Sequence, residues 1–383
     1  MRQILILPLL AWYSVAAQKT ADEGPSLGVS AYADTYYSWY SKVTATALQQ
    51  HDAIGAFHNN FGINIAQVSA HYNGHFLRGV ATVHFGDIPL ITWAPNYRNI
   101  QEANIGVKLT DGVWFDIGAF KTHVGTESFL PKENLMSILT LATYYGPFYQ
   151  SGARLSIDKH RWHLELHAIN GYNLHIDNNP YKTFGVLAQR QIGSRWLVSY
   201  SNMLGQERVG QLDDGYLIYQ NAYTTYTYER WQWQMGFDLA YADQWKTNQG
   251  WIGPLYTGLV TGKYRVANRW SLSARAEVFS DEHSINSFRM SPARFGQVSY
   301  VASTVGMTVY GLTVGVEYKP EADNGFVRIE SRTLYDPDAT TSLYPSWFDQ
   351  TTAGKVPMLN SRTQILFTAA MYFDWIVKTA KGQ

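Results

Sequence analysis

Residues 231–239 read WQWQMGFDL, a stretch in which the side chains alternate in polarity almost residue by residue. One side of the extended chain is apolar: Trp231, Trp233, Met235, Phe237 and Leu239. The other side is polar: Gln232, Gln234 and Asp238. Successive side chains of a β-strand point to opposite faces. This period of two residues therefore predicts a strand with one apolar and one polar face.

The same alternation recurs from Leu27 to Phe373 and predicts about sixteen strands. We expect them at residues 27–40, 60–72, 75–86, 100–110, 113–122, 149–158, 161–170, 181–192, 195–204, 216–228, 231–243, 254–266, 269–281, 303–319, 325–335 and 362–373. Most of these segments have about 10–14 residues. Strands of soluble domains average about 5–6 residues, whereas a tilted strand that crosses a bilayer needs about 9–11. The lengths therefore favour strands that span a membrane.

Short and long connections alternate between these strands. The short connections are 73–74, 111–112, 159–160, 193–194, 229–230, 267–268 and 320–324. Asn73-Gly74 and Asp111-Gly112 are strong hairpin signals, because both central residues of such a turn take positive φ. The long connections are 41–59, 87–99, 123–148, 171–180, 205–215, 244–253, 282–302 and 336–361. This layout is typical of a transmembrane antiparallel β-barrel.

Closure of the sheet follows from the solvent. Hydrocarbon cannot satisfy backbone N–H and C=O groups, so a sheet in a bilayer must leave no edge. We therefore predict an all-β fold, with residues 18–383 forming a single transmembrane β-barrel. Aromatic girdles would be formed by residues near strand ends, such as Trp39, Trp114, Trp162, Trp196, Trp231, Trp270 and Trp375. A soluble β-propeller is the alternative, but it needs neither strands of this length nor a continuous apolar face.

The composition agrees with this class of protein. The 383 residues include 30 Lys and Arg and 30 Asp and Glu, so the chain lacks the excess of basic residues that nucleic-acid binding needs. Charged residues make up 16%, and aromatic residues make up 15%, which excludes a disordered chain. The sequence contains no cysteine, which excludes disulfides, thiolate metal sites and cysteine nucleophiles.

The N-terminal segment 1–17 has the features of a cleaved secretory signal peptide. Arg2 supplies a positive charge, residues 4–15 are apolar, and Val15-Ala16-Ala17 supplies small residues before Gln18. An apolar stretch of 12 residues is too short to span a bilayer as a helix, which needs about 20. An N-terminal core strand or helix is the alternative. We expect export to the cell outer membrane, where lipid surrounds the protein.

A barrel of about sixteen strands is wide enough to hold a water-filled lumen. The polar faces of the strands would point into it. The charged residues that we expect to line the pore are Arg78, Lys108, Asp116, Arg154, Glu165, Arg275, Glu277, Glu317, Lys319, Arg328, Glu330 and Arg332. Because acids and bases are mixed, their count predicts no strong preference for one ion. The alternative for any one of them is that it only braces the wall.

The loop 123–148 is the most apolar of the long connections. It contains Leu135, Met136, Ile138, Leu139, Leu141 and Ala142. A loop of this composition is expected to fold into the barrel, pack on the wall and narrow the pore. A cap over the barrel or a contact with a partner protein is the alternative.

Residues 118–127 read GAFKTHVGTE. This stretch resembles the segment G-x-F-x-T-x-x-G-x-E of the OmpL-like group of outer-membrane β-barrel porins. Further similar stretches are 32–37, 146–148, 151–154, 170–172 with 178–179, and 326–332. The likeness covers nearly the whole mature chain and implies a diffusion channel in the outer membrane of a Gram-negative bacterium. The sequence departs from the family at His123, where proline is usual, and in the tail 374–383.

Candidate sites for chemistry are few. No G-x-S-x-G, H-E-x-x-H or phosphate-binding motif occurs in the sequence. His163, Glu165 and His167 would share one face of a strand, but at about 6.6–7 Å per two residues the spacing is wide for one metal ion. Asp336 and Asp338 could bind calcium or form a turn. A hydrolase site at the outer rim would use Asp281, Glu282 and His283. We expect no enzyme activity, no metal and no cofactor.

These features together predict an outer-membrane porin. Small hydrophilic solutes and ions would diffuse passively through the barrel, with no nucleic-acid partner. The alternatives are a plugged or gated barrel whose loops bind a partner, and a hydrolase active at the rim. Porins of this size are often trimers, and the sequence leaves a homo-oligomer open.

Overall fold

The computed structural model describes residues 25–41, 48–49, 51–207, 215–243, 250–286, 288–292, 298–302, 306–320, 324–338 and 360–378. The predicted signal peptide 1–17 lies outside these residues. Parts of the predicted connections also lie outside them, namely 42–47, 50, 208–214, 244–249, 287, 293–297, 321–323 and 339–359, as do residues 303–305 of the predicted strand 303–319.

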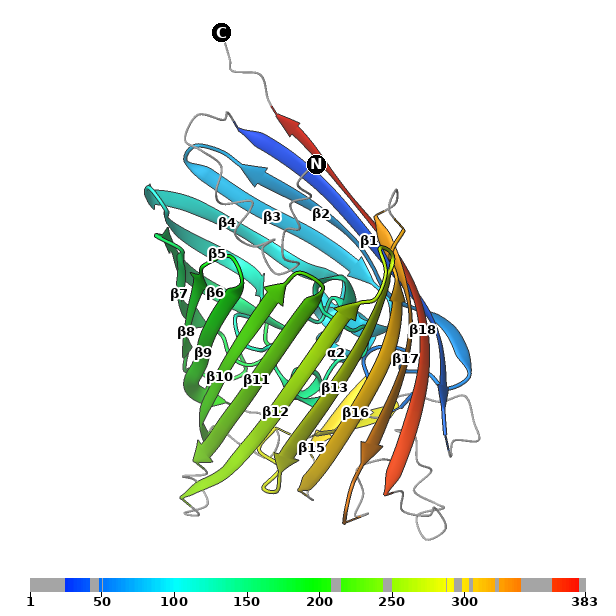
Figure 1. The fold of residues 1–383 in the computed structure, drawn as a ribbon. Helices are drawn as coiled ribbons and strands as arrows, with labels where there is room; N and C mark the ends of the chain where they lie inside the picture. The colour runs from blue at the N-terminus through cyan, green and yellow to red at the C-terminus, as the bar shows by residue number, and fades with distance from the viewer. Residues whose placement is uncertain are drawn as a thin grey trace.

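Sixteen antiparallel strands of the described chain close into one barrel. Figure 1 shows the strands side by side around it. They are β1 (Ser26–Tyr40), β2 (Asn60–Asn73), β3 (Leu77–Phe85), β4 (Ile100–Thr110), β5 (Val113–Lys121), β6 (Tyr149–Lys159), β7 (Trp162–Ile169), β8 (Thr183–Ile192), β9 (Trp196–Glu207), β10 (Gly215–Tyr228), β11 (Trp231–Asp243), β12 (Trp251–Arg265), β13 (Trp270–Asp281), β16 (Met307–Tyr318), β17 (Gly325–Tyr335) and β18 (Ser361–Lys378). Each strand pairs with its neighbour in sequence within this set. The prediction of an antiparallel barrel of about sixteen strands is confirmed.

The first and last strands close the barrel. β1 pairs with β18 from Ser26 opposite Lys378 to Tyr40 opposite Gln364. In Figure 1 the blue β1 lies beside the red β18. The predicted end of the last strand at residue 373 was wrong, because β1 begins at Ser26 and its first residues pair with residues 374–378. Unpaired backbone groups there would leave an open edge, and the longer β18 removes it.

The two faces of the barrel differ in polarity, as the alternation predicts. On β16, Leu312 is 58% exposed on the outer face, whereas its neighbour Thr313 is fully buried. The outer face also carries exposed tryptophans near strand ends, namely Trp39, Trp162, Trp196, Trp231, Trp270 and Trp375. Trp114 does not belong to this girdle. It lies under the guanidinium group of Arg78, 4.7 Å from the ring centre, on the inner face.

The short turns lie at one end of the barrel and the long loops at the other. Gly112 in the turn between β4 and β5 has φ 75°, and a Cβ atom there would lie 2.4 Å from the carbonyl oxygen of Asp158. This position therefore needs glycine.

The long loops contain short elements of their own. These are α2 (Asp87–Thr92), η1 (Pro95–Tyr97), η2 (Pro131–Glu133), α3 (Leu141–Tyr145) and a hairpin of β14 (Phe288–Pro292) and β15 (Val298–Ala302). The hairpin falls in 282–302, which was predicted as loop only. No helix in the described ranges is long and apolar enough to cross a bilayer.

Apolar side chains of three loops pack inside the barrel at its loop end. We call this group the loop core: Ile54, Ile88, Trp93, Phe129, Leu141 and Tyr145, none more than 3% exposed. The loop core contacts inward side chains of the wall. The ring of Tyr145 lies 4.9 Å from that of Phe279 on β13, and the ring of Trp93 lies 4.5 Å from that of His84 on β3. Burial of apolar surface therefore holds these loops inside the barrel.

Leu312→Arg should destabilise the barrel by about 2–4 kcal/mol, because it places a charge on the lipid-facing side of a spanning strand. The measurement is the free energy of unfolding in lipid vesicles, from urea titration followed by tryptophan fluorescence. Leu312→Phe keeps the position apolar and should change it by less than about 1.5 kcal/mol. Equal stability of the two variants would contradict the assignment of this face to lipid.

Candidate functional site in the barrel lumen

The loop 122–148, between β5 and β6, folds across the lumen to the opposite wall. Its apolar side chains Leu130, Met136, Ile138 and Leu139 are at most 3% exposed. The side chain of Thr140 accepts a hydrogen bond from the backbone N–H of Thr143 and so begins α3. A loop this apolar is more stable against the wall than in water, because folding inward removes apolar surface from solvent.

Thr126 attaches the first arm of this loop to β10 and β11. Asn221 on β10 donates a hydrogen bond to the hydroxyl of Thr126 (3.0 Å), and Gln234 on β11 donates one to its carbonyl (2.8 Å). Gly236 on β11 has no side chain, and a Cβ atom there would lie 2.1 Å from the Thr126 hydroxyl oxygen. Glycine at 236 thus lets the loop approach the wall.

Charged wall residues satisfy the backbone of the loop further along. Glu330 on β17 accepts hydrogen bonds from the N–H groups of Ser137 (2.7 Å) and Ile138 (2.8 Å). Arg328 on the same strand donates to the carbonyls of Pro131 (3.0 Å) and Asn134 (3.1 Å). Buried backbone groups need such partners. The wall charges therefore replace the water that the loop backbone gives up.

A chain of buried ion pairs connects two loops to the wall. We call it the ion-pair chain, and its members alternate in sign: Arg362, Asp52, Arg332, Glu277, Arg275 and Glu127. Their side chains are at most 2% exposed. The N–O distances along the chain are 2.7, 3.0, 3.0, 3.8 and 3.0 Å. Asp52 lies in the first long loop and Glu127 in the loop 122–148, so one network fixes both loops.

Asp52 shows how this network balances charge. Burial raises the pKa of the Asp52 carboxyl, and the guanidinium groups of Arg362 and Arg332 oppose that rise. A buried carboxylate is costly unless it is paired. The two arginines therefore keep a charged loop residue tolerable inside the barrel.

The structure separates the twelve predicted pore-lining residues into two groups. The first group lies on β13, β16 and β17 behind the loops and is at most 7% exposed: Arg275, Glu277, Glu317, Arg328, Glu330 and Arg332. The second group has five members on the opposite wall: Arg78, Lys108, Asp116, Arg154 and Glu165. Its sixth member, Lys319, follows β16 and is not on that wall. The run Arg328-Ile329-Glu330-Ser331-Arg332 holds a loop rather than facing open water, which its sequence alone could not reveal.

The second group centres on one row of paired residues across four strands. Arg78 on β3 pairs with Gly106 on β4, and Gly106 pairs with Asp116 on β5. Asp116 in turn pairs with Arg154 on β6. Arg78 binds Asp116 through two nitrogens, at 2.7 and 2.5 Å, and Arg154 approaches the same carboxylate at 3.3 Å. A Cβ atom at Gly106 would lie 2.1 Å from the Asp116 carboxylate. Glycine there lets Arg78 reach across β4.

His123, the departure from the family motif, lies buried on the inner wall. Its ring stacks on that of His167, with centres 4.0 Å apart, and its Nε2 lies 2.9 Å from the carbonyl oxygen of Asn202. Burial, and then the proximity of His167, lowers the pKa of His123 to about 3. Gly185 on β8 makes room for this ring, since a Cβ atom there would lie 2.2 Å from Nε2. His123 is therefore a neutral packing residue at pH 7.

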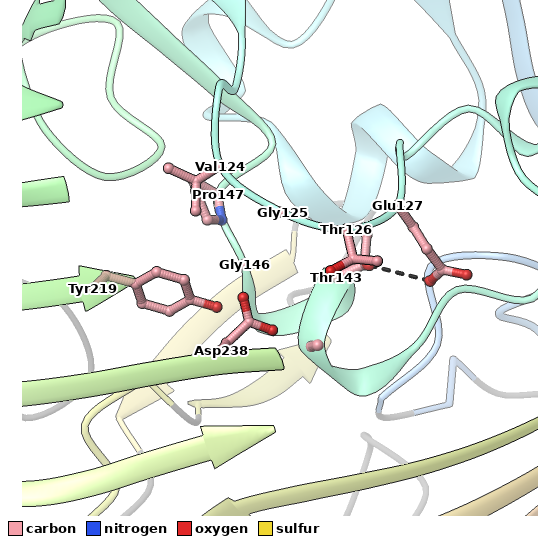
Figure 2. Close-up of a pocket in the computed structure, with 10 residues that line it drawn as sticks. Val124, Gly125, Thr126, Glu127, Thr143, Gly146, Pro147, Tyr219 and Asp238 are labelled. Atoms are coloured by element: carbon pink, nitrogen blue, oxygen red, sulfur yellow. Dashed lines mark hydrogen bonds between the residues drawn. The ribbon is translucent and has the colours of Figure 1, made fainter. Parts of the chain in front are cut away.

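A small cavity lies between the two arms of the loop and the wall (Figure 2). Its lining residues are Val124, Gly125, Thr126, Glu127, Ala142, Thr143, Gly146, Pro147, Tyr219 and Asp238. The cavity volume is about 10 Å³, which is close to the space of one water molecule. Asp238 already accepts hydrogen bonds from Asn221 (2.8 Å) and Thr257 (2.5 Å). The cavity is too small for a solute.

The candidate metal residues and Asp281 have structural contacts, whereas Glu282 and His283 of the candidate hydrolase site are exposed. Glu165 lies between two histidines, 3.2 Å from His163 and 2.9 Å from His167, and the described chain contains no group of three or more such ligands arranged for a metal. Asp281 accepts hydrogen bonds from the N–H groups of Ile285 (2.7 Å) and Asn286 (2.9 Å), which fixes a turn. Asp336 accepts one from the N–H of Asp338 (3.0 Å), again a turn.

Arg275→Leu should release the loop, because it leaves Glu127 and Glu277 buried without this partner. The expected cost is about 3–5 kcal/mol in the free energy of unfolding, with faster proteolysis within 128–147. Lys182→Met is the control, since the Lys182–Asp177 pair is solvent-exposed and worth about 0–1 kcal/mol. Unchanged proteolysis in the Arg275 variant would show that the ion-pair chain does not hold the loop.

His123→Gln should make stability less dependent on pH. The folded protein keeps His123 neutral down to about pH 3, whereas the unfolded chain binds a proton below about pH 6.5. Wild-type stability should therefore fall as pH drops from about 6.5 toward 3, by up to about 1.4 kcal/mol per pH unit from this group. Urea unfolding midpoints of the two proteins at pH 7, 5.5 and 4 measure this. The same dependence of the unfolding midpoint on pH in both proteins would contradict this prediction. The control is His160→Gln in an exposed turn, whose midpoints should match those of wild type.

Known structures share this architecture. The chain is similar to OmpT, an outer membrane protein of Vibrio cholerae, at 14% identity and TM-score 0.55, over 92% of this chain and 99% of that one. It is also similar to an anion-selective porin from Comamonas acidovorans, at 11% identity and TM-score 0.61, over 91% of this chain and 100% of that one. At these identities the likeness shows the barrel fold alone. No curated protein matches the sequence.

The family is given by the sequence itself. A family model described as "Putative beta-barrel porin-2, OmpL-like" matches residues 26–374, from the first residue of β1 to within the last strand. Together with the closed barrel, this match supports a location in the outer membrane. The chain belongs to the OmpL-like family of β-barrel porins.

Proposed function

We propose that this protein is a passive diffusion channel for small hydrophilic solutes and ions, exported through a cleaved signal peptide (1–17). The single observation that supports it best is the difference between the two walls of the lumen. The first long loop and the loop 122–148 cover the charges of β13, β16 and β17, where the side chains of Arg275, Arg328 and Arg332 are at most 2% exposed. On the other wall, Arg78 and Arg154 remain 19% and 18% exposed.

The solvated path would run along the wall formed by β3 to β7. The loop 122–148 would narrow this path and set its size limit. The charged residues of that wall would act on ions that pass. Passive diffusion needs no catalytic residue, and we propose that the protein is not an enzyme.

The loop core favours a second candidate, a barrel whose loops open and close. Side chains such as Trp93, Phe129 and Tyr145 fill the loop end with apolar contacts that a gate would have to break. In that case the protein would conduct only after the loops move. Electrical recording separates the two candidates.

The purified protein in a planar bilayer should give stable stepwise currents that are linear in voltage. Glu330→Ala removes the acceptor for two N–H groups of the loop and should raise the single-channel conductance and its noise. Glu229→Ala, in an exposed turn, is the control and should match wild type. Folded, inserted protein without current would reject the open channel, and current only from the Glu330 variant would favour the gated barrel.

A further inference from the structure

The row Arg78, Gly106, Asp116 and Arg154 presents two fixed cations to the lumen. Its acid is hidden, because the Asp116 side chain is 0% exposed, whereas those of Arg78 and Arg154 are 19% and 18% exposed. Arg78 uses Nε and Nη2 on Asp116, and Nη2 also donates to the hydroxyl of Ser156 (2.7 Å). The acid thus orients the guanidinium groups while it is itself covered from the lumen.

Two aromatic rings support these guanidinium groups. Arg78 lies 4.7 Å from the ring centre of Trp114, and Arg154 lies 4.6 Å from that of Phe120. Both rings belong to β5, the strand that also carries Asp116. A guanidinium group stacked on a ring loses less freedom when it binds an anion, because its plane is already fixed. One strand, β5, therefore holds in place two arginines that come from β3 and β6.

The neighbouring charges are mostly paired with one another. Lys108, two residues from Gly106 toward the turns, is 32% exposed and binds Asp111 in the turn (2.6 Å), whose side chain is 95% exposed. Glu165 contacts Arg154 at 3.3 Å, but its side chain is only 8% exposed. Asp158 is bound to His163 at 2.7 Å. Glu102 on β4 is half-buried and is the remaining acid near Arg154.

We propose that Arg78 and Arg154 form a binding subsite for small anionic solutes that carry carboxylate groups. The inference rests on the proposed channel function and adds a substrate class to it. A guanidinium group carries five N–H donors in a planar fork, so it can hold Asp116 and still donate to the carboxylate of a solute, which a single ammonium cannot reproduce. A solute with a carboxylate at each end would bind one of the two arginines first and the other as it moves through the pore.

The test is ion selectivity and block in planar bilayers. In a KCl gradient the wild-type reversal potential should show anion preference, and sodium succinate added on the side of the short turns should reduce the chloride current. Arg78→Gln and Arg154→Gln should lower the anion preference and raise the half-blocking succinate concentration by about tenfold, the value of one charge-assisted hydrogen bond.

Two further variants separate charge, recognition and folding. Arg154→Lys keeps the charge but loses the planar fork, so the reversal potential should stay near wild type while succinate block weakens. Arg190→Gln is the matched control: Arg190 is exposed and stacks on Trp162 at 4.9 Å on the outer face, so selectivity should not change. The heat-dependent shift in gel mobility that folded barrels show confirms that each variant is folded.

Three outcomes would overturn the inference. Cation-selective current in wild type would reject it, as would equal succinate block in wild type and the Arg154→Gln variant. Both leave the channel function in place, because current is still observed. Absence of current in folded wild-type protein would reject the channel and the subsite together.

Discussion

The structure depends on one constraint, the need of every backbone N–H and C=O group in hydrocarbon for a partner within the protein. The pairing of β1 with β18 meets it, because it joins the two strands that would otherwise be edges. Once the sheet is closed, the alternation of side chains has two consequences. Apolar residues such as Leu312 face lipid, and polar residues such as Thr313 face a space that the wall alone does not fill.

That interior space explains the buried charges. Loops that enter it exchange water for protein, so their backbone groups and carboxylates need new partners. Arg328 and Glu330 supply these partners to one loop, and Arg332 and Arg362 supply them to Asp52 of another. The cost of burying these charges is offset by the contacts of the loop core, which bring the loops inward. Charge and apolar burial thus act on the same segments.

The lumen is asymmetric as a result. One wall is covered and neutral within itself, and the other keeps arginines at the water boundary. Gly106 on β4 has no side chain and so lets Arg78 reach Asp116 on this second wall. Trp114 and Phe120 on β5 stack against the guanidinium groups of Arg78 and Arg154. The match to the OmpL-like family extends over residues 26–374, and the barrel is formed by strands along that whole range. Selectivity, in contrast, would be decided by these few side chains.

The fold could be predicted from the sequence by three features: the period of two residues, the segment lengths, and turns such as Asp111-Gly112. Each of these features depends only on residues that are neighbours along the chain. Strand number and the two faces followed from them, and the apolar composition of 123–148 predicted that this loop folds inward. Only the tertiary structure decided which charges face water. Arg154 and Arg332 look alike in sequence, but a loop distant in sequence covers Arg332 and leaves Arg154 partly exposed. Such coverage depends on contacts between segments that are distant in sequence. The strand conformation of the last five residues of β18 depends on such contacts too, because these residues pair with β1.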